Sequence, residues 1–600
     1  MERHFSPAGG AFLVEERTPE AVFIPEDFQA EDRLIGQTAE DFLRKEVMPQ
    51  GERIEQADYT LMRDLMRKAG ELGLLGADVP EVYGGLGLSQ PTAALIAEKL
   101  NPQQSFALTH EAHTVIATLP LLYFGNHDQK SRYLPKLASG EWIGSFALSE
   151  ANSGSDALAM ETRATLTPDG KQYLLNGTKM WITNTAFADL FTVFAKVDGE
   201  KVTGFLVERT FPGVSFGKEE HKLGMHGTST RRVILDEVLV PIENVLEVGK
   251  GHYAAFCALN MGRFKLEAGA VGGLKETLAT CTAYAKQRKT FGHPLAEYGL
   301  IQHKLAEMAA RTFALESMVY RLAGDLENAF SGIVADAPDA SLRYHRAAEE
   351  YAIECNIVKV IGSETYSQMT DEAIQIHGGY GYTEEFPLAR AWRDQRLLRI
   401  GEGANEIVRL AIINTLLRRD KAGRLPLLTY GKQVSTAMHR LCDGSPYCFE
   451  ISLAGMGGAV QDSKQLVLFL LTLATEQLGE EFSQAQEIIA AIADIVCGTY
   501  ALESVWLRAS KLQTTHPTHF PAVEKAALVV AWNFSQDAVR ATHYILDSLE
   551  YAQKRALLEK ESRLAILLRC LTWHNLNPIQ IRRDLAKIVL EKDGYFGGNS

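Results

Sequence analysis

The sequence predicts an α+β fold in four parts: an N-terminal α-helical bundle, a middle antiparallel β-domain, a C-terminal α-helical bundle and an additional C-terminal helical domain. The chain has 600 residues, which is too many for one hydrophobic core. Helical periodicity fills residues 27–143 and returns after residue 253, whereas short β-branched runs alternate with turns between them. We expect domains at 1–143, 144–253, 254–418 and 419–600, with the first ~26 residues as an extended arm.

The N-terminal bundle is predicted from runs such as EDFLRKEVMP and TLMRDLMRKAGELGLLG, in which apolar residues recur every three or four positions. The glycine-bearing segment VPEVYGGLGLSQ, residues 79–90, is not a dinucleotide-binding loop. It contains GGxG instead of GxGxxG, and no ribose-binding acid follows at the required distance. We interpret it as a turn.

The β-domain is predicted from short runs rich in β-branched and aromatic residues, separated by Gly, Asn and Asp. The runs are IGSFALSE, YLLNGTKMWITN, LFTVFAKVDG, KVTGFLVER, GVSFG and RRVILDEVLVP. Sequential runs of this kind are typical of antiparallel pairing, because a tight turn can connect them.

Long helices are predicted again after the β-domain. Residues 267–288 form a helix rich in small residues that ends at KTFG, with basic residues in its last turn. Further helices are expected over 301–327 and 340–379, and in the additional domain over 486–512 and 521–549. The additional domain contains no catalytic motif. Its apolar run LVLFLLTLA is about half as long as a membrane-spanning helix.

Composition indicates an ordinary globular protein, with 46% hydrophobic and 23% charged residues. The net charge of −14 and the pI near 5.7 disfavour a nucleic-acid-binding protein, which needs a basic face. The seven cysteines (257, 281, 355, 442, 448, 497 and 570) form no CxxC pair, so we expect reduced thiols and no metal site. The N-terminus lacks the features of a signal or transit peptide, and we expect a cytoplasmic protein.

The stretch RIGEGANEI, residues 399–407, places Glu402 between Gly401 and Gly403. Glycine is usually kept where another residue would not fit, or where the backbone approaches a ligand closely. By itself this pattern also fits a solvent-exposed loop glutamate.

Six motifs in order resemble those of the acyl-CoA dehydrogenase family of flavoenzymes. They are LSEANSGSD (148–156), NGTKMWITN (176–184), NMGRFKLEAGAVG (260–272), QRKTFG (287–292), IQIHGGYGY (374–382) and RIGEGANEI. The resemblance covers roughly residues 30–416, and the additional C-terminal domain is most similar to the very-long-chain branch.

The resemblance implies that Glu402 is the base that removes the α-proton of an acyl-CoA thioester. A carboxylate suits this step, because burial beside an alkyl chain raises its pKa towards the working range. Some family members carry the base at a second position, which is Gly262 in this chain. Of the two positions, only Glu402 therefore has a side chain that can ionise. The backbone N–H of Glu402 and an FAD hydroxyl would stabilise the enolate oxygen, and the hydride would pass to flavin N5.

The resemblance also assigns the residues that bind FAD and substrate. The expected FAD contacts are Phe146, Leu148, Ser149, Trp181 and Thr183 around the flavin ring, Arg288, Thr290 and Phe291 on the pyrophosphate and adenine, and Gln375, Gly378 and Gly379 from a neighbouring subunit, with Ala404 and Glu406 after the base. The expected substrate contacts are Ser155 and Arg263 at the CoA moiety and Gly401 beside the acyl chain. Other roles stay open: Trp181 as a core aromatic, Arg288 as a helix-dipole partner and Arg263 in a surface salt bridge.

Two positions depart from the family pattern. Ala151 replaces a Pro, and Ala404 replaces a Thr whose hydroxyl would bond to FAD. The second departure weakens the assignment of Ala404 and leaves that of Glu406 open.

The function implied by the resemblance is FAD-dependent α,β-dehydrogenation of a fatty acyl-CoA in β-oxidation, with electrons passed to electron-transferring flavoprotein. Alternatives are an acyl-CoA oxidase that reduces oxygen, a flavoprotein scaffold with little activity, and an enzyme similar to nitroalkane oxidase, which uses an Asp base. The resemblance further implies a homodimer and a possible peripheral membrane contact through the additional domain.

Overall fold

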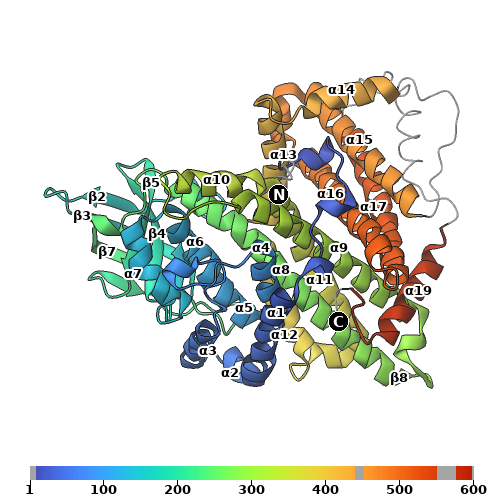
Figure 1. Cartoon of the computed structure of the whole chain (residues 1–600), viewed down its shortest axis with the longest axis horizontal. Helices are drawn as coiled ribbons and strands as arrows, with labels where there is room; N and C mark the ends of the chain where they lie inside the picture. Colours follow the sequence, from blue (N-terminus) through green and yellow to red (C-terminus); the bar gives the residue numbers. More distant parts are fainter. Residues whose placement is uncertain (1–7, 439–451, 550–575, 598–600) are drawn as a thin grey trace.

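The computed structural model describes residues 8–438, 452–549 and 576–597. The β-domain occupies one end of the long axis and the additional helical domain the other, with the two helical bundles between them (Figure 1). This arrangement confirms the α+β fold with an extra helical domain.

The N-terminal arm lies against the C-terminal bundle and the additional domain. It contains three short 3₁₀ turns, Ala11–Leu13, Pro19–Ala21 and Pro25–Asp27, instead of one extended segment. Arg17 forms an ion pair of 2.5 Å with Asp325. The Nζ of Lys464 donates a hydrogen bond of 2.9 Å to the carbonyl of Glu15. The arm therefore joins two helical domains.

The N-terminal bundle contains seven α-helices among the residues described. They are α1 (Ala30–Phe42), α2 (Gly51–Glu55), α3 (Tyr59–Glu71), α4 (Gln90–Leu100), α5 (Gln104–Glu111), α6 (Leu119–Phe124) and α7 (His127–Ala138), with a π-helical turn at Ala112–Ala117. Asp58 and Ser89 cap α3 and α4 by accepting hydrogen bonds from backbone N–H groups. The turn predicted at 79–90 is confirmed, because a 3₁₀ turn there ends at Gly84 with φ of 81°.

The β-domain is a mixed sheet of seven strands. They are β1 (Gly144–Ala147), β2 (Arg163–Leu166), β3 (Gln172–Thr183), β4 (Leu190–Val197), β5 (Lys201–Glu208), β6 (Val214–Phe216) and β7 (Thr230–Pro241). The predicted antiparallel pairing holds for β2–β3, β3–β7, β4–β5 and β6–β7. However, β1 and β2 pair in parallel with successive halves of β4. These parallel pairs are long-range, so the order of the runs could not predict them.

The C-terminal bundle is built on two very long helices. Its elements are α8 (Gly251–Gln287), α9 (Gly299–Phe330), α10 (Ala340–Glu350), α11 (Ala352–His377), α12 (Pro387–Gln395) and α13 (Asn405–Lys421), with the short strands β8 (Lys289–Thr290) and β9 (His293–Pro294). Helix α8 begins 16 residues before the predicted start at residue 267, and the single helix expected over 340–379 is interrupted at Tyr351.

The additional domain is helical, as predicted. Its described helices are α14 (Leu427–Met438), α15 (Leu453–Leu478), α16 (Gln486–Thr515), α17 (Phe520–Ser548) and α19 (Pro578–Glu591). Within the described ranges, only α16 is long and apolar enough to cross a membrane, but 78% of that window is buried inside the fold. Four cysteines, 257, 281, 355 and 497, are buried free thiols, whereas 442, 448 and 570 lie outside the described residues.

Candidate active site

Glu402 lies in a short loop between the 3₁₀ turn Arg396–Arg399 and the start of α13. Its backbone has φ of 55°, in the left-handed region that residues with a side chain rarely adopt. Gly403 follows with φ of 100°, which explains a glycine at this position. Backbone strain of this kind concentrates at functional sites, where the surrounding structure holds it in place.

The carboxyl group of Glu402 is set up to exchange a proton near neutral pH. Its Oε2 atom is buried and accepts no hydrogen bond from any residue that the structure describes. Burial raises the pKa of Glu402 to about 7, although the nearby charges of Arg263 and Lys359 lower it. A carboxyl with this pKa suits a general base.

Two cations, the half-buried Arg263 and the buried Lys359, hold the loop through its carbonyl groups. The Nε of Arg263, on α8, donates a hydrogen bond of 2.8 Å to the carbonyl of Glu402. The Nζ of Lys359, on α11, donates bonds of 2.5 Å to the carbonyl of Gly403 and to Oδ1 of Asn405. The bent backbone is thus fixed from both sides.

The arrangement corrects the interpretation of Arg263 as a surface salt bridge. Its Nη1 donates to Oδ1 of Asn260 at 3.0 Å and to Oδ1 of Asn356 at 2.9 Å, in addition to the Nε bond to Glu402. Arg263 therefore holds the backbone of Glu402, and its predicted contact with CoA stays a prediction.

Gly262 lies directly opposite the carboxyl of Glu402. A β-carbon at Gly262 would be 3.3 Å from Cδ and 3.4 Å from Oε2 of Glu402. Gly262, the alternative position for the base, is therefore next to Glu402 in space. This adjacency is expected if a base at either position acts on the same substrate atom. Gly401 is different, because a β-carbon there would come no closer than 3.6 Å to Leu397. The room that Gly401 would provide for an acyl chain stays a prediction.

The residues predicted at the flavin ring gather at the ends of β1 and β3. Phe146 and Leu148 are buried, and the carbonyl of Ser149 accepts a bond of 2.9 Å from the N–H of Met180. Trp181 has φ of 57°, and 55% of it is exposed, which excludes the core-aromatic interpretation. Thr183 accepts a bond of 2.5 Å from Ser145 at its carbonyl. An exposed indole beside an ordered strand end fits a flat aromatic ring.

The β-domain group is connected to helix α5, and the π-helical turn that follows α5 lies beside Gly262. Nδ2 of Asn184, next to Thr183, donates a bond of 3.0 Å to the carbonyl of Thr109 on α5. The π-helical turn after α5 brings Cγ2 of Ile116 to 3.1 Å from a β-carbon at Gly262. The strand ends and Glu402 therefore flank the same pair of helices.

A second predicted FAD group lies elsewhere. Arg288, Thr290 and Phe291 lie at β8, and β8 and the strands β2 and β3 are at opposite ends of the long axis (Figure 1). The guanidinium of Arg288 is 5.7 Å from the ring centre of Tyr380, and Phe291 is 91% exposed with φ of 53°. One chain therefore does not bring the two groups together.

The remaining predicted residues are on the surface or in the base loop. Gln375, Gly378 and Gly379 are exposed at the end of α11, and β-carbons at the two glycines would meet no atom of the described chain within 4 Å. Glu406 is exposed in the first turn of α13, where its charge complements the helix dipole. Ala404 is the N-cap of that helix, and Ser155 is exposed after β1.

Sequence reasoning missed two residues that position Glu402. Lys359 stands alone within the apolar run NIVKVIG, and Asn405 follows the glycine loop. A lone lysine within an apolar helical run is a signal for a buried cation with a specific partner. That signal was available in the sequence, although the partner was not.

The chain matches family models over most of its length. The models for the acyl-CoA dehydrogenase N-terminal, middle and C-terminal domains match residues 29–141, 145–238 and 249–417, and a further C-terminal domain model matches 462–560. A probable acyl-CoA dehydrogenase of Bacillus subtilis is 42% identical over 596 residues, covering 98% of each chain. The bovine mitochondrial very-long-chain-specific enzyme is 38% identical over 63% of this chain and 56% of its own.

Solved structures agree with these relatives. The acyl-CoA dehydrogenase of Bacillus anthracis, solved in complex with FAD, superposes with a TM-score of 0.94 at 42% identity, covering 98% of this chain and all of that one. Butyryl-CoA dehydrogenase of Megasphaera elsdenii covers 65% of this chain with a TM-score of 0.59 at 33% identity. Together with the placement of Glu402 opposite Gly262, these findings show that the chain belongs to the acyl-CoA dehydrogenase family of FAD-dependent oxidoreductases.

Proposed function

We propose that this enzyme converts a fatty acyl-CoA to the trans-2-enoyl-CoA in fatty acid β-oxidation. The observation that carries the proposal is the buried, unbonded Oε2 of Glu402, in a carboxyl whose pKa burial raises to about 7. Among the residues that the structure describes, none donates a hydrogen bond to this oxygen. A thioester placed against this oxygen would find one base and, at Gly262, no competing side chain.

Each side chain has a defined task in this reaction. Glu402 takes the α-proton of the thioester on its carboxylate. Arg263 and Lys359 hold the loop carbonyls, so that the N–H of Glu402 can face the thioester oxygen. When bound, FAD supplies the acceptor for the hydride that leaves the β-carbon. Trp181, Thr183 and the end of β1 would hold its ring.

The proposals for the oligomeric state and for the electron acceptor are supported by the family membership and by the separation of the two groups of predicted FAD residues. Because β3, which carries Trp181, and β8, which follows Arg288, lie at opposite sides of one chain (Figure 1), we propose a homodimer in which each FAD contacts both subunits. Electron-transferring flavoprotein is the proposed acceptor of the electrons, and the cytoplasm the proposed compartment. We also propose a peripheral membrane contact of the additional domain. Helix α16 would not make this contact, because most of it is buried inside the fold.

The test is Glu402→Gln in the FAD-loaded enzyme, followed by anaerobic reduction of the flavin with acyl-CoAs of increasing chain length. The variant should keep FAD and bind substrate, but its flavin reduction should be at least roughly a thousandfold slower. Near-normal reduction would show that Glu402 is not the base.

The same purified protein distinguishes the dehydrogenase from the two alternatives, an oxidase and a flavoprotein scaffold. Rapid formation of peroxide when the reduced enzyme meets air would identify an oxidase. A purified chain that is colourless and cannot be reconstituted with FAD would be a scaffold.

A further inference from the structure

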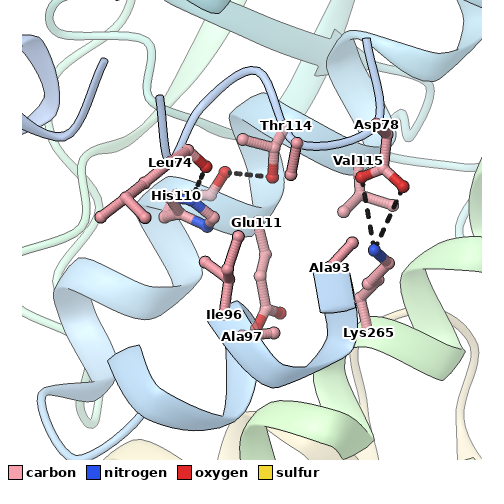
Figure 2. A pocket seen from close by; sticks show the side chains of 11 residues that line it. Leu74, Asp78, Ala93, Ile96, Ala97, His110, Glu111, Thr114, Val115 and Lys265 are labelled. Atoms are coloured by element: carbon pink, nitrogen blue, oxygen red, sulfur yellow. Dashed lines mark hydrogen bonds and ion pairs between the residues drawn. The ribbon is translucent and has the colours of Figure 1, made fainter. Parts of the chain in front are cut away.

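The carboxyl group of Glu402 and the backbone that follows it are held by different parts of the molecule. The carboxyl lies opposite Gly262 on α8. Figure 2 shows a small cavity between α4, α5 and α8, whose lining includes Glu111 and Lys265 but none of the described side chains that donate hydrogen bonds to the loop of Glu402. The groups that fix the loop after Glu402 lie instead on α11 and α13.

Asn405, the first residue of α13, links the loop to α11. Oδ1 of its buried amide accepts a hydrogen bond of 2.5 Å from Nζ of Lys359, which also donates to the carbonyl of Gly403. Nδ2 of the same amide donates a bond of 2.9 Å to Oε1 of Glu364. An amide has one donor end and one acceptor end, and a carboxylate only accepts. Glu364 therefore fixes the Nδ2 end on its own side, which turns Oδ1 towards Lys359.

Arg409, one turn further along α13, holds the carboxylate of Glu364 with two parallel hydrogen bonds. Its Nη1 donates to Oε1 at 2.7 Å, and its Nη2 donates to Oε2 at 2.9 Å. Burial alone would raise the pKa of Glu364, but the bonds from Arg409 and Asn405 and the nearby charge of Arg399 hold it below its ordinary value. Because Arg399 precedes Glu402 and Asn405 follows it, one carboxylate interacts with both ends of the loop.

The additional domain reaches this group of residues through Asp494 on α16. Helix α13 packs against α16 (Figure 1), and Oδ1 of Asp494 accepts a hydrogen bond of 2.7 Å from Nε of Arg409. A guanidinium is planar, so with Nε bound to Asp494 its two Nη atoms are directed at Glu364. The side chain of Asp494 is 50% exposed, and water therefore weakens this ion pair.

We propose that Asp494 of the additional domain is a positioning residue for the loop of Glu402. The inference rests on the proposed function. Asp494 acts through Arg409 and Glu364, and the series of contacts ends on the carbonyl of Gly403. The loop has φ of 55° at Glu402 and 100° at Gly403, a shape that persists only while its neighbours hold it. The additional domain thus contributes to the rate of proton removal without contacting the substrate.

The first experiment compares the FAD-loaded wild type with Asp494→Asn, measuring anaerobic flavin reduction at increasing concentrations of saturated acyl-CoAs of several lengths. Asp494→Asn should slow the limiting rate of reduction about threefold. The substrate concentration that gives half of this rate should not change, because the residue acts on the loop and not on the substrate. Glu487→Gln, at an exposed acid in the first turn of the same helix, is the matched control and should leave both quantities unchanged.

The second experiment tests whether Asp494 acts through Glu364. Glu364→Gln keeps the size of the side chain but removes the charge that Arg409 binds, and it should slow flavin reduction at least about tenfold. Adding Asp494→Asn to Glu364→Gln should slow the reaction by less than about 1.5-fold more, because the series of contacts is already broken. Two separate losses of stability would instead multiply.

Two results would overturn the proposal. The first is an FAD-loaded Asp494→Asn that reduces its flavin as fast as Glu487→Gln, a comparison that holds even if Glu364→Gln fails to fold. The second is a double variant that is threefold slower than Glu364→Gln alone. If the wild type reacts with no acyl-CoA of any length, the proposed function itself fails, and the two failures are distinguishable.

Discussion

Gly262 and Glu402 are in direct opposition: a β-carbon on the glycine would be 3.3 Å from Cδ of the glutamate. The two residues lie 140 positions apart, on α8 and in the loop before α13. This adjacency makes the location of the base testable by moving it.

Gly262→Glu should partly restore the activity of Glu402→Gln. The β-carbon of the new side chain would lie beside the position of the original carboxyl, and residue 262 is in the interior of α8, where glutamate is a good helix former. We expect the double variant to reduce its flavin roughly tenfold to a hundredfold faster than Glu402→Gln alone, because a displaced base retains part of the effect. Gly262→Gln in the same background is the matched control. Equal rates for these two double variants would contradict the assignment.

Flavin reduction should rise with pH through about 7 and level off above it, because Glu402 acts as the base only when ionised. The free energy of unfolding should instead fall as the pH rises. Folding raises the pKa of Glu402 from about 4.5 to about 7. The contribution of Glu402 to the free energy of unfolding is therefore fully present below pH 4.5 and is lost as the pH rises through about 7.

The measurement is the difference in unfolding free energy between the wild type and Glu402→Gln from acid to neutral pH. The wild type should lose stability relative to the variant over this range. Other buried acids near the site, Glu111 and Glu267, remain in both proteins and largely cancel in the difference. A difference that does not change with pH would show that the carboxyl is solvated.

Lys359→Met should slow flavin reduction and raise the apparent pKa of the base. The substitution removes the donor to the carbonyl of Gly403 and a charge that lowers the pKa of Glu402. We expect a loss of about tenfold or more in rate, measured as a pH profile of flavin reduction. A purely structural role would lower stability without moving the pKa. Lys432→Met, at an exposed lysine on α14, is the control and should leave both unchanged.

Glu26→Gln should destabilise the junction of the N-terminal arm with the additional domain. Arg508, fully buried on α16, makes ion pairs of 2.7 Å with Glu26 and 2.6 Å with Glu316. Removing one charge from a buried cluster should cost about 2–4 kcal/mol of unfolding free energy, measured by denaturant titration. Glu20→Gln, at an exposed site in the same arm, should change stability by less than about 0.5 kcal/mol. Equal effects of the two substitutions would contradict this account.

The order of helical and β-strand segments could be predicted from the chain alone, because it depends on local information. Periodicity of three to four or of two separates helix from strand, whereas the prediction of Glu402 as the base depended on the family resemblance, because its two glycines also fit an exposed loop. The interruption at Tyr351 and the parallel pairs of β4 could not be predicted, since both depend on packing between distant segments.

The sequence alone shows which residues occupy the two positions where the family resemblance implies a base: a glutamate at 402 and a glycine at 262. The tertiary structure decided how that group behaves. The burial of its carboxyl and the donors Arg263 and Lys359 come from segments far apart in the chain. A pKa depends on the local dielectric and on nearby charges, and only folding brings these together.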